Sequence, residues 1–305
     1  MALNGQHAEQ LLQRAVRRAR PYRSRIGRLG RLAAHPWRMV YPRLLLKTGR
    51  SQTLSATTFW GGRMEIVVPE AVSTQIFRYG FFEEDVCLFL LKSLRPGMVC
   101  VDVGAHFGFF TLLASELVGP EGRVVALEPM PETFARLARN VAEHRSCDNI
   151  TPLQSAAYSS ATTLTFCDYG LVYSAFNSAF GARLPSGRRS CGEVRVAART
   201  CDDLVGALGL PRVDVIKIDA ESSELHVVRG AQRTIARFRP RIVVEVGDFD
   251  LPGVASSREL VQSLLALGYR AYERSQFDLT PHVPRATYDY GNLLFVPPRS
   301  AHSTA

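Results

Sequence analysis

The stretch that most constrains the fold of this chain runs from Val99 to Gly108. It begins with a short apolar run rich in β-branched residues and continues into a turn that contains Gly104 and Gly108. A helical pattern, Phe109 to Ala114, follows at once. The order of strand, glycine-rich turn and helix is typical of the nucleotide-binding corner of a doubly wound α/β sheet. The sequence therefore predicts an open, mostly parallel sheet with a ligand crevice beside this turn.

The spacing around the glycines indicates which ligand the turn accepts. Dinucleotide sites follow the pattern G-x-G-x-x-G, whereas this turn reads Asp102-x-Gly104-x-x-x-Gly108. An acid this close would repel a pyrophosphate, but it suits a positively charged ligand such as the aminoacyl sulfonium of S-adenosylmethionine. We expect Asp102 to organise the turn and the methionine end of that cofactor. Gly104 and Gly108 permit close backbone approach and positive φ.

The second signal is Glu128, which ends the predicted strand Arg123–Leu127 and is followed by Pro129. Doubly wound folds place a carboxylate about 20 residues after the glycines, where it accepts hydrogen bonds from the ribose hydroxyls. Ser155 and Ala156 follow the next predicted strand, where this architecture contacts the adenine. The alternative for Glu128 is a solvated acid at a strand end.

The third signal is the acidic stretch that follows the apolar strand Val213–Ile218. Acids at the carboxyl end of the strand beside the first turn face the ligand crevice of an open sheet. Asp219 is the first candidate for a general base, which a poorly nucleophilic hydroxyl would need. Glu221 would assist it or, together with Glu245, provide oxygen ligands for a divalent cation. The alternative is that these carboxylates only hydrogen-bond the loop or the cofactor, so no metal ligand is assigned.

Together the three motifs resemble the FkbM-type S-adenosylmethionine-dependent methyltransferases, over roughly residues 79 to 250. The resemblance implies a Rossmann-like, seven-stranded, mostly parallel sheet with an antiparallel last strand, the class I methyltransferase fold. It also implies methyl transfer to a hydroxyl of a sugar, a glycan or a polyketide-type secondary metabolite. The expected cofactor-binding residues are Glu84, Asp102, Gly104, Ala105, His106, Gly108, Glu128, Pro129, Ser155, Ala156 and Asp219; the expected catalytic residues are Asp219 and Glu221.

The chain departs from the family pattern in two places. His106 stands where the turn commonly has Asn, and the usual acid-Gly-acid sequence after the central strand becomes Glu221-Ser222-Ser223-Glu224. The loss of that glycine bears on the shape of the loop and on the direction in which Glu221 points.

Two segments are expected to cover the crevice. Glu83 or Glu84, just before the predicted helix Val86–Leu94, would reach the amino group of the cofactor, or else these acids only complement the helix dipole. Residues 167–192 have no regular pattern and contain several aromatic side chains. Long irregular insertions of this kind are usually functional loops, so we interpret this one as a substrate lid, with disorder as the alternative.

The charge of the chain is unevenly distributed. Residues 1–50 contain 12 Lys and Arg and one acid, Glu9, so this arm carries 12 − 1 = +11 and the remainder carries 9 − 11 = −2. A slightly acidic body argues against a nucleic-acid substrate. The arm has an amphipathic pattern from Ala8 to Arg20, and residues 1–35 would dock on an anionic membrane surface or a partner, or form a solvated tail.

We divide the chain into a basic extension (1–50), a hairpin with a lid helix (51–98), a methyltransferase domain (99–298) and a tail (299–305). The six cysteines show no C-x-x-C pair or zinc spacing, and no signal peptide or long apolar segment is visible. We therefore expect a cytoplasmic protein, peripheral at the inner membrane surface if the arm docks there. The rival functions are a non-catalytic S-adenosylmethionine-binding module and an NAD-linked oxidoreductase; a small-molecule or glycan acceptor remains the expected partner.

Overall fold

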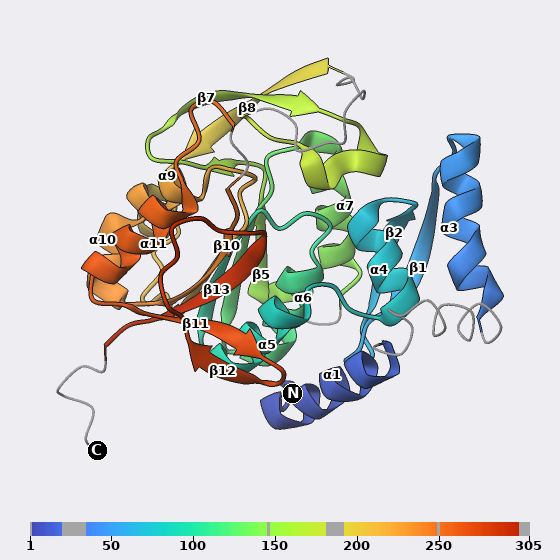
Figure 1. The fold of residues 1–305 in the computed structure, drawn as a ribbon, viewed down its shortest axis with the longest axis horizontal. Coiled ribbons are helices and arrows are strands. Elements are labelled where there is room, and N and C mark those ends of the chain that lie inside the picture. The colour runs from blue at the N-terminus through green and yellow to red at the C-terminus, as the bar shows by residue number, and fades with distance from the viewer. Residues whose placement is uncertain (1, 20–34, 145–146, 181–191, 249–250, 299–305) are drawn as a thin grey trace.

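The computed structural model describes residues 2–19, 35–144, 147–180, 192–248 and 251–298. Their centre is an eight-stranded sheet in the order β12-β11-β13-β10-β9-β3-β4-β5 (Figure 1). The five strands from β10 to β5 are parallel, and β13 runs antiparallel between β10 and β11. The predicted Rossmann-like fold with an antiparallel last strand is therefore confirmed, but the sheet has eight strands instead of the expected seven, because β12 is added at one edge.

The strands of this sheet are β3 (Val99–Val103), β4 (Arg123–Leu127), β5 (Ile150–Leu153), β9 (Val215–Ile218), β10 (Arg241–Val246), β11 (Arg270–Ser275), β12 (Asp278–Pro281) and β13 (Gly291–Val296). The helices are α1 (Gly5–Ala19), α3 (Pro36–Thr48), α4 (Ala71–Tyr79), α5 (Glu84–Ser93), α6 (Phe109–Val118), α7 (Pro131–Ala142), α8 (Cys201–Ala207), α9 (Glu224–Arg229), α10 (Gln232–Phe238) and α11 (Ser257–Ala266), with the 3-10 turns η2 (Cys147–Asn149) and η3 (Leu171–Phe176).

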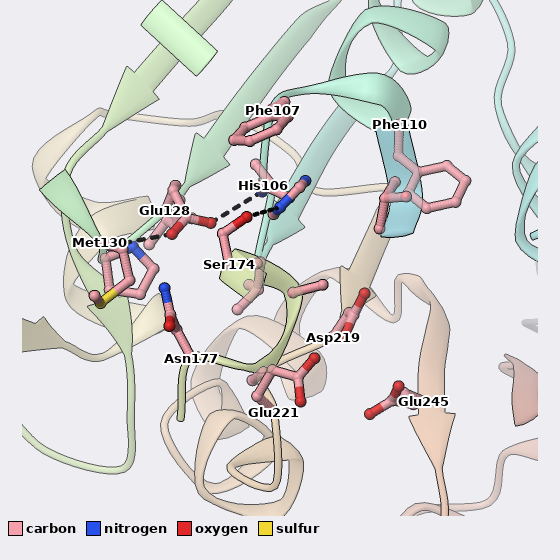
Figure 2. A pocket seen from close by; sticks show the side chains of 18 of the residues that line it. His106, Phe107, Phe110, Glu128, Met130, Ser174, Asn177, Asp219, Glu221 and Glu245 are labelled. Carbon is pink, nitrogen blue, oxygen red and sulfur yellow. Dashed lines mark hydrogen bonds between the residues drawn. The ribbon is translucent and has the colours of Figure 1, made fainter. Parts of the chain in front are cut away.

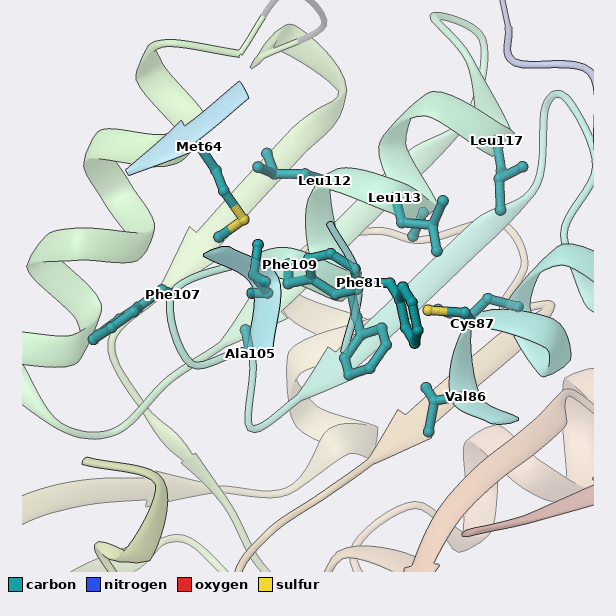
Figure 3. Packing of buried hydrophobic residues seen from close by; sticks show 14 of the residues in the cluster. Met64, Phe81, Val86, Cys87, Ala105, Phe107, Phe109, Leu112, Leu113 and Leu117 are labelled. Atoms are coloured by element: carbon teal, nitrogen blue, oxygen red, sulfur yellow. The ribbon is translucent and has the colours of Figure 1, made fainter. Parts of the chain in front are cut away.

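Both faces of the sheet are buried, as the continuous apolar strands require. Successive residues of β3 point to opposite faces. Cys100 joins a core cluster with α5 and α6, whereas Val101 joins a second cluster with α8 to α11. Figure 3 shows the first cluster, in which Phe109 and Leu113 of α6 pack near Phe81 and Cys87. The core thus fixes the carboxyl edge of the sheet, where the site lies.

Two smaller sheets lie beside this core. The hairpin of β1 (Gln52–Thr57) and β2 (Arg63–Val68) confirms the hairpin expected there. The strands β6 (Ala156–Ala157), β7 (Thr162–Asp168) and β8 (Gly192–Arg199) form a three-stranded sheet in the order β6-β8-β7. Part of the expected lid, residues 181–191, lies outside the described residues. The described part contains η3, which lines the pocket described below.

The apolar face of α1 packs against its own chain. Ala8, Leu12 and Val16 are buried, and the helix lies against α5. Lys92 of α5 pairs with Glu9 at 3.4 Å. This face is therefore not available for a membrane. Residues 20–34, which belong to the segment expected to dock on a membrane or a partner, lie outside the described residues.

Four elements differ from the sequence-based expectation. The sequence did not predict α3, α4 or the edge strand β12. The four residues of β12 are mostly exposed and show no strand pattern. The helix expected over Leu225–Phe238 is divided into α9 and α10 at Gly230. A Cβ at Gly230 would lie 2.0 Å from the carbonyl oxygen of Tyr158, so the chain passes too close there for a side chain.

The packing of α1 gives a test of whether the basic arm belongs to the folded body. Leu12 is fully buried, so Leu12→Ala should lower the free energy of unfolding by about 2–5 kcal/mol. Gln10 is exposed on the same helix, and Gln10→Ala should change it by less than about 0.5 kcal/mol. Urea unfolding of both variants measures the difference. Equal stabilities would show that α1 is not part of the cooperative core.

Candidate active site

A pocket of about 390 Å³ opens at the carboxyl ends of β3, β4, β9 and β10. This is the volume of a small-molecule site. Figure 2 shows Glu128 on one side and Asp219, Glu221 and Glu245 on the other, with Ser174 and Asn177 reaching in from η3 and the residue after it. Parallel strands bring their carboxyl ends to one edge, so motifs far apart in sequence meet here.

The first turn is built around Gly104, whose φ is +72°. A Cβ at this residue would lie 1.7 Å from the carbonyl oxygen of Asp219, so only glycine permits the turn to lie against the end of β9. The amides of Gly104 and Ala105 donate to the carbonyl of Leu127 at 3.0 and 2.9 Å. These bonds hold the turn against the end of β4, beside Glu128.

Glu128 is buried and each of its oxygens accepts a backbone hydrogen bond. Oε2 accepts from the amide of His106 at 2.9 Å, and Oε1 accepts from the amide of Met130 at 3.0 Å. Burial raises the pKa of Glu128 to about 7, and the two amide bonds counteract this rise. A carboxylate has about four acceptor sites, so both oxygens can accept one further bond each from a ligand in the pocket.

Beneath the turn, the ammonium group of Lys217 contacts two carboxylates and one backbone carbonyl. Its Nζ lies 3.4 Å from Oδ1 of Asp102 and 3.3 Å from Oδ2 of Asp219, and it donates to the carbonyl of Gly104 at 2.9 Å. Burial of the ammonium lowers its pKa, but the carboxylates of Asp219 and Asp102 more than offset this and hold the pKa above its usual value. Asp102 also accepts from Thr111 Oγ1 at 2.6 Å.

His106 lies in the turn with φ +50°, a left-handed conformation that a residue other than glycine adopts less readily. Its ring stacks on Phe107, and Nε2 lies 2.8 Å from Oγ of Ser174 in η3. Burial lowers the pKa of His106 to about 3, with the charge of Lys217 as a smaller cause. The imidazole is therefore neutral, and its contact with Ser174 joins the turn to η3.

The turn after β9 keeps a left-handed shape although its glycine is missing. Glu221 and Ser222 have φ values of +46° and +80°. Oε1 of Glu224 accepts from the amides of Ala220 at 3.0 Å and Ser222 at 3.1 Å, and Ser178 Oγ donates to the carbonyl of Glu221 at 2.7 Å. These bonds hold the turn so that Glu221 lines the pocket.

Most of the expected site residues line one pocket, and three do not. The lining includes Gly104, Ala105, His106, Glu128, Pro129, Ser155, Ala156, Asp219 and Glu221. It does not include Asp102, Gly108 or Glu84. Asp102 lies beneath the turn with Lys217, which suits a role in organising the turn more than direct contact with a ligand.

The position of Glu84 differs from our expectation for the acids before α5. It pairs with Arg274 of β11 at 2.6 Å and is not among the residues that line the pocket. Glu83 instead receives a hydrogen bond from Tyr290, which does line the pocket. Burial raises the pKa of Glu83 to about 8, and the nearby charge of Asp219 adds to the rise.

Sequence reasoning did not assign roles to Lys217, Ser174, Asn177 and Tyr290. For Lys217 a signal existed, because a lysine inside an apolar strand buried on both faces requires a carboxylate partner. Its register partner in β3 is Asp102. Ser174 and Asn177 belong to the segment 167–192, which was interpreted as a lid, but no pattern singles out these two residues. Tyr290 precedes β13 and carries no comparable signal.

No group of three or more His, Cys, Asp or Glu side chains that could hold a metal ion occurs within the described ranges. The expected divalent cation therefore has no such site in this part of the chain. In the same part, no helix is long and apolar enough to cross a membrane.

Comparison with known proteins assigns the class. A family model described as the methyltransferase FkbM domain matches residues 102–271, more than half of the chain. The protein is therefore a methyltransferase by family. Specifically, it belongs to the FkbM-domain methyltransferases, as the sequence motifs predicted.

Two curated relatives and one solved structure illustrate the match. The 31-O-demethyl-FK506 methyltransferase FkbM of Streptomyces tacrolimicus is 28% identical over 180 residues, 52% of this chain and 68% of that protein. The hexuronic acid methyltransferase AglP of Haloferax volcanii is 28% identical over 189 residues, 61% of this chain and 72% of the relative. A methyltransferase FkbM from Methylobacillus flagellatus aligns with a TM-score of 0.42 and 16% identity, over 74% of this chain and only 55% of that one.

The low pKa of His106 predicts a pH effect on stability. A histidine that stays neutral when folded contributes stability that is complete above about pH 6.5 and is lost as the pH falls toward about 3. Between about pH 7 and pH 5, wild type should lose about 1–2 kcal/mol more unfolding free energy than His106→Asn, which does not titrate. Urea unfolding at both pH values measures this. The exposed His7→Asn serves as control, and an equal loss in wild type and His106→Asn would contradict the prediction.

Proposed function

We propose that this chain is an S-adenosylmethionine-dependent O-methyltransferase. One observation supports this most. The same pocket contains a buried carboxylate that can accept further hydrogen bonds and, on its other side, acidic residues that follow the end of a strand. Glu128 can accept two ribose hydroxyls, while Asp219 and Glu221 line the other side. A dinucleotide would instead require that its pyrophosphate lie beside the first turn, above the pair of Asp102 and Lys217. This turn lacks the G-x-G-x-x-G pattern of dinucleotide sites.

The residues of the pocket fit this cofactor. The backbone of Gly104 to His106 would lie along its methionine and ribose, Glu128 would bind the ribose hydroxyls, and Ser155 and Ala156 would contact the adenine. When bound, S-adenosylmethionine supplies a methyl group on a sulfonium, which is an excellent leaving group. The protein therefore has to hold the acceptor oxygen in line and exclude water, a contribution of about 7–11 kcal/mol in well-oriented systems.

Asp219 is the proposed general base. Lys217 approaches its Oδ2 at 3.3 Å, which leaves Oδ1 to accept the proton of an acceptor hydroxyl. The side chain is one quarter exposed and lies at the end of a rigid strand. Glu221, in the next turn, would orient the acceptor or assist the proton transfer.

The acceptor side of the pocket has an apolar wall. Met64, Val72, Ile76 and Phe82 line it from β2, α4 and the segment before α5, all before the residues that match the family model. Such a wall favours a hydroxyl carried on an apolar, polyketide-type body over a free sugar. The relatives whose names state an acceptor, an FK506 derivative and a hexuronic acid, represent the two classes.

Glu128 provides the test of the cofactor. Removing its charge should cost about 1.5–3 kcal/mol of binding, so Glu128→Gln should raise the Kd for S-adenosylmethionine about 10- to 100-fold by calorimetry. Glu132→Gln removes an exposed acid at the start of α7 and should leave the Kd unchanged. An unchanged Kd in Glu128→Gln, or no binding to wild type, would exclude this cofactor site.

Asp219 provides the test of catalysis. With 31-O-demethyl-FK506 and glucuronic acid as acceptor probes, Asp219→Asn should lower the release of S-adenosylhomocysteine about 10²- to 10⁴-fold. The Kd for S-adenosylmethionine should stay within a few-fold of wild type. Full turnover by Asp219→Asn would exclude it as the base. Cofactor binding by wild type without turnover of either probe would favour the non-catalytic binding module.

A further inference from the structure

Helix α3 (Pro36–Thr48) carries apolar residues on two sides, and the protein covers only one of them. Met39, Pro42 and Leu45 are buried, and the helix packs against α4. The carbonyl of Arg38 accepts a hydrogen bond from Arg78 at 3.3 Å. An apolar helix face is normally buried against another element, so the exposed apolar side of α3 lacks a cover.

The outer side is formed by Trp37, Val40 and Leu44. Their spacing of i, i+3 and i+7 places them on one face of the helix, opposite the buried residues. They are 60%, 37% and 50% exposed. Seven large hydrophobic side chains are exposed within the described ranges, and four of them, these three and Leu46, belong to this one helix. Figure 1 shows α3 at the edge of the molecule, beyond α4 and β1.

The charges beside the exposed apolar face of α3 indicate which kind of partner this face binds. Arg43 and Lys47 follow Val40 and Leu44 by three residues each and therefore form the neighbouring row of the helix. Helix α3 contains three basic residues, Arg38, Arg43 and Lys47, and no Asp or Glu. Such a density of positive charge opposes contact with a second copy of the same segment and favours an anionic surface. Trp37 stacks on Tyr41, and these are the side chains enriched at membrane interfaces.

We propose that α3 is an interfacial helix that docks the protein on an anionic membrane surface. Trp37, Val40 and Leu44 enter the boundary between headgroups and acyl chains, while Arg43 and Lys47 contact the anionic headgroups. The helix lies in the plane of the membrane and does not cross it. This contact is separate from the pocket and does not depend on the proposed methyl transfer. It also differs from contact through α1, whose apolar face is covered by α5.

Vesicle co-sedimentation of the full chain tests the proposal. Vesicles of phosphatidylcholine with about 30% phosphatidylglycerol should bind wild type at low ionic strength, and vesicles of phosphatidylcholine alone should bind at least about tenfold less. The double variant Trp37→Glu/Leu44→Glu should bind the anionic vesicles at least about tenfold more weakly than wild type. Leu267→Glu replaces an exposed leucine at the end of α11 and should bind like wild type.

Three results would overturn the proposal. The first is no binding of wild type to either kind of vesicle. The second is equal binding by wild type and the double variant, which would assign membrane contact to the basic residues outside α3. The third is a wild-type dimer in sedimentation velocity that the double variant abolishes, which would assign the face to a second copy. Near-UV circular dichroism and S-adenosylmethionine binding of each variant establish that the fold is intact, whatever the outcome.

Discussion

The site depends on one buried cation, Lys217. It lies on the central strand β9, is 3% exposed and contacts carboxylates from two strands together with the carbonyl of Gly104. Loss of the buried carboxylate of Asp102 would leave a buried charge that is only partly compensated, which typically costs about 3–5 kcal/mol. Because Asp102 and Asp219 belong to neighbouring strands, this cluster determines how the first turn lies against the end of β9. The shape of the pocket therefore follows from an ion cluster in which Lys217 and Asp219 line the pocket and Asp102 does not.

The sequence was sufficient for the parts of the site that lie on parallel strands. Glu128 and Asp219 each end a strand, and parallel strands bring such ends to a common edge. It was not sufficient where side-chain direction depends on packing. Glu83 and Glu84 are adjacent, yet the backbone of Glu83 has a φ of +35° and its side chain meets Tyr290, while Glu84 meets Arg274. No spacing rule separates these two outcomes, because both partners lie about two hundred residues later in the chain.

The same limit applies to whole elements. The strand β12 is a short, mostly exposed edge strand, and α3 has apolar residues on both sides instead of one stripe, so neither shows the periodicity by which elements are recognised. The segment before β3 nevertheless contributes part of the pocket wall through Met64, Val72 and Ile76. The side of the pocket formed by Gly104 to His106 and Glu128 thus lies within the family match, whereas this wall belongs to a segment outside it.

The turn after β9 has a consequence for how this sequence can change. A glycine would adopt the left-handed backbone of Ser222 at little cost, but a serine there needs support, and the carboxylate of Glu224 provides it through two amide hydrogen bonds. The two positions are therefore epistatic. In a chain with glycine at 222, position 224 is freer to vary; in this chain it is not.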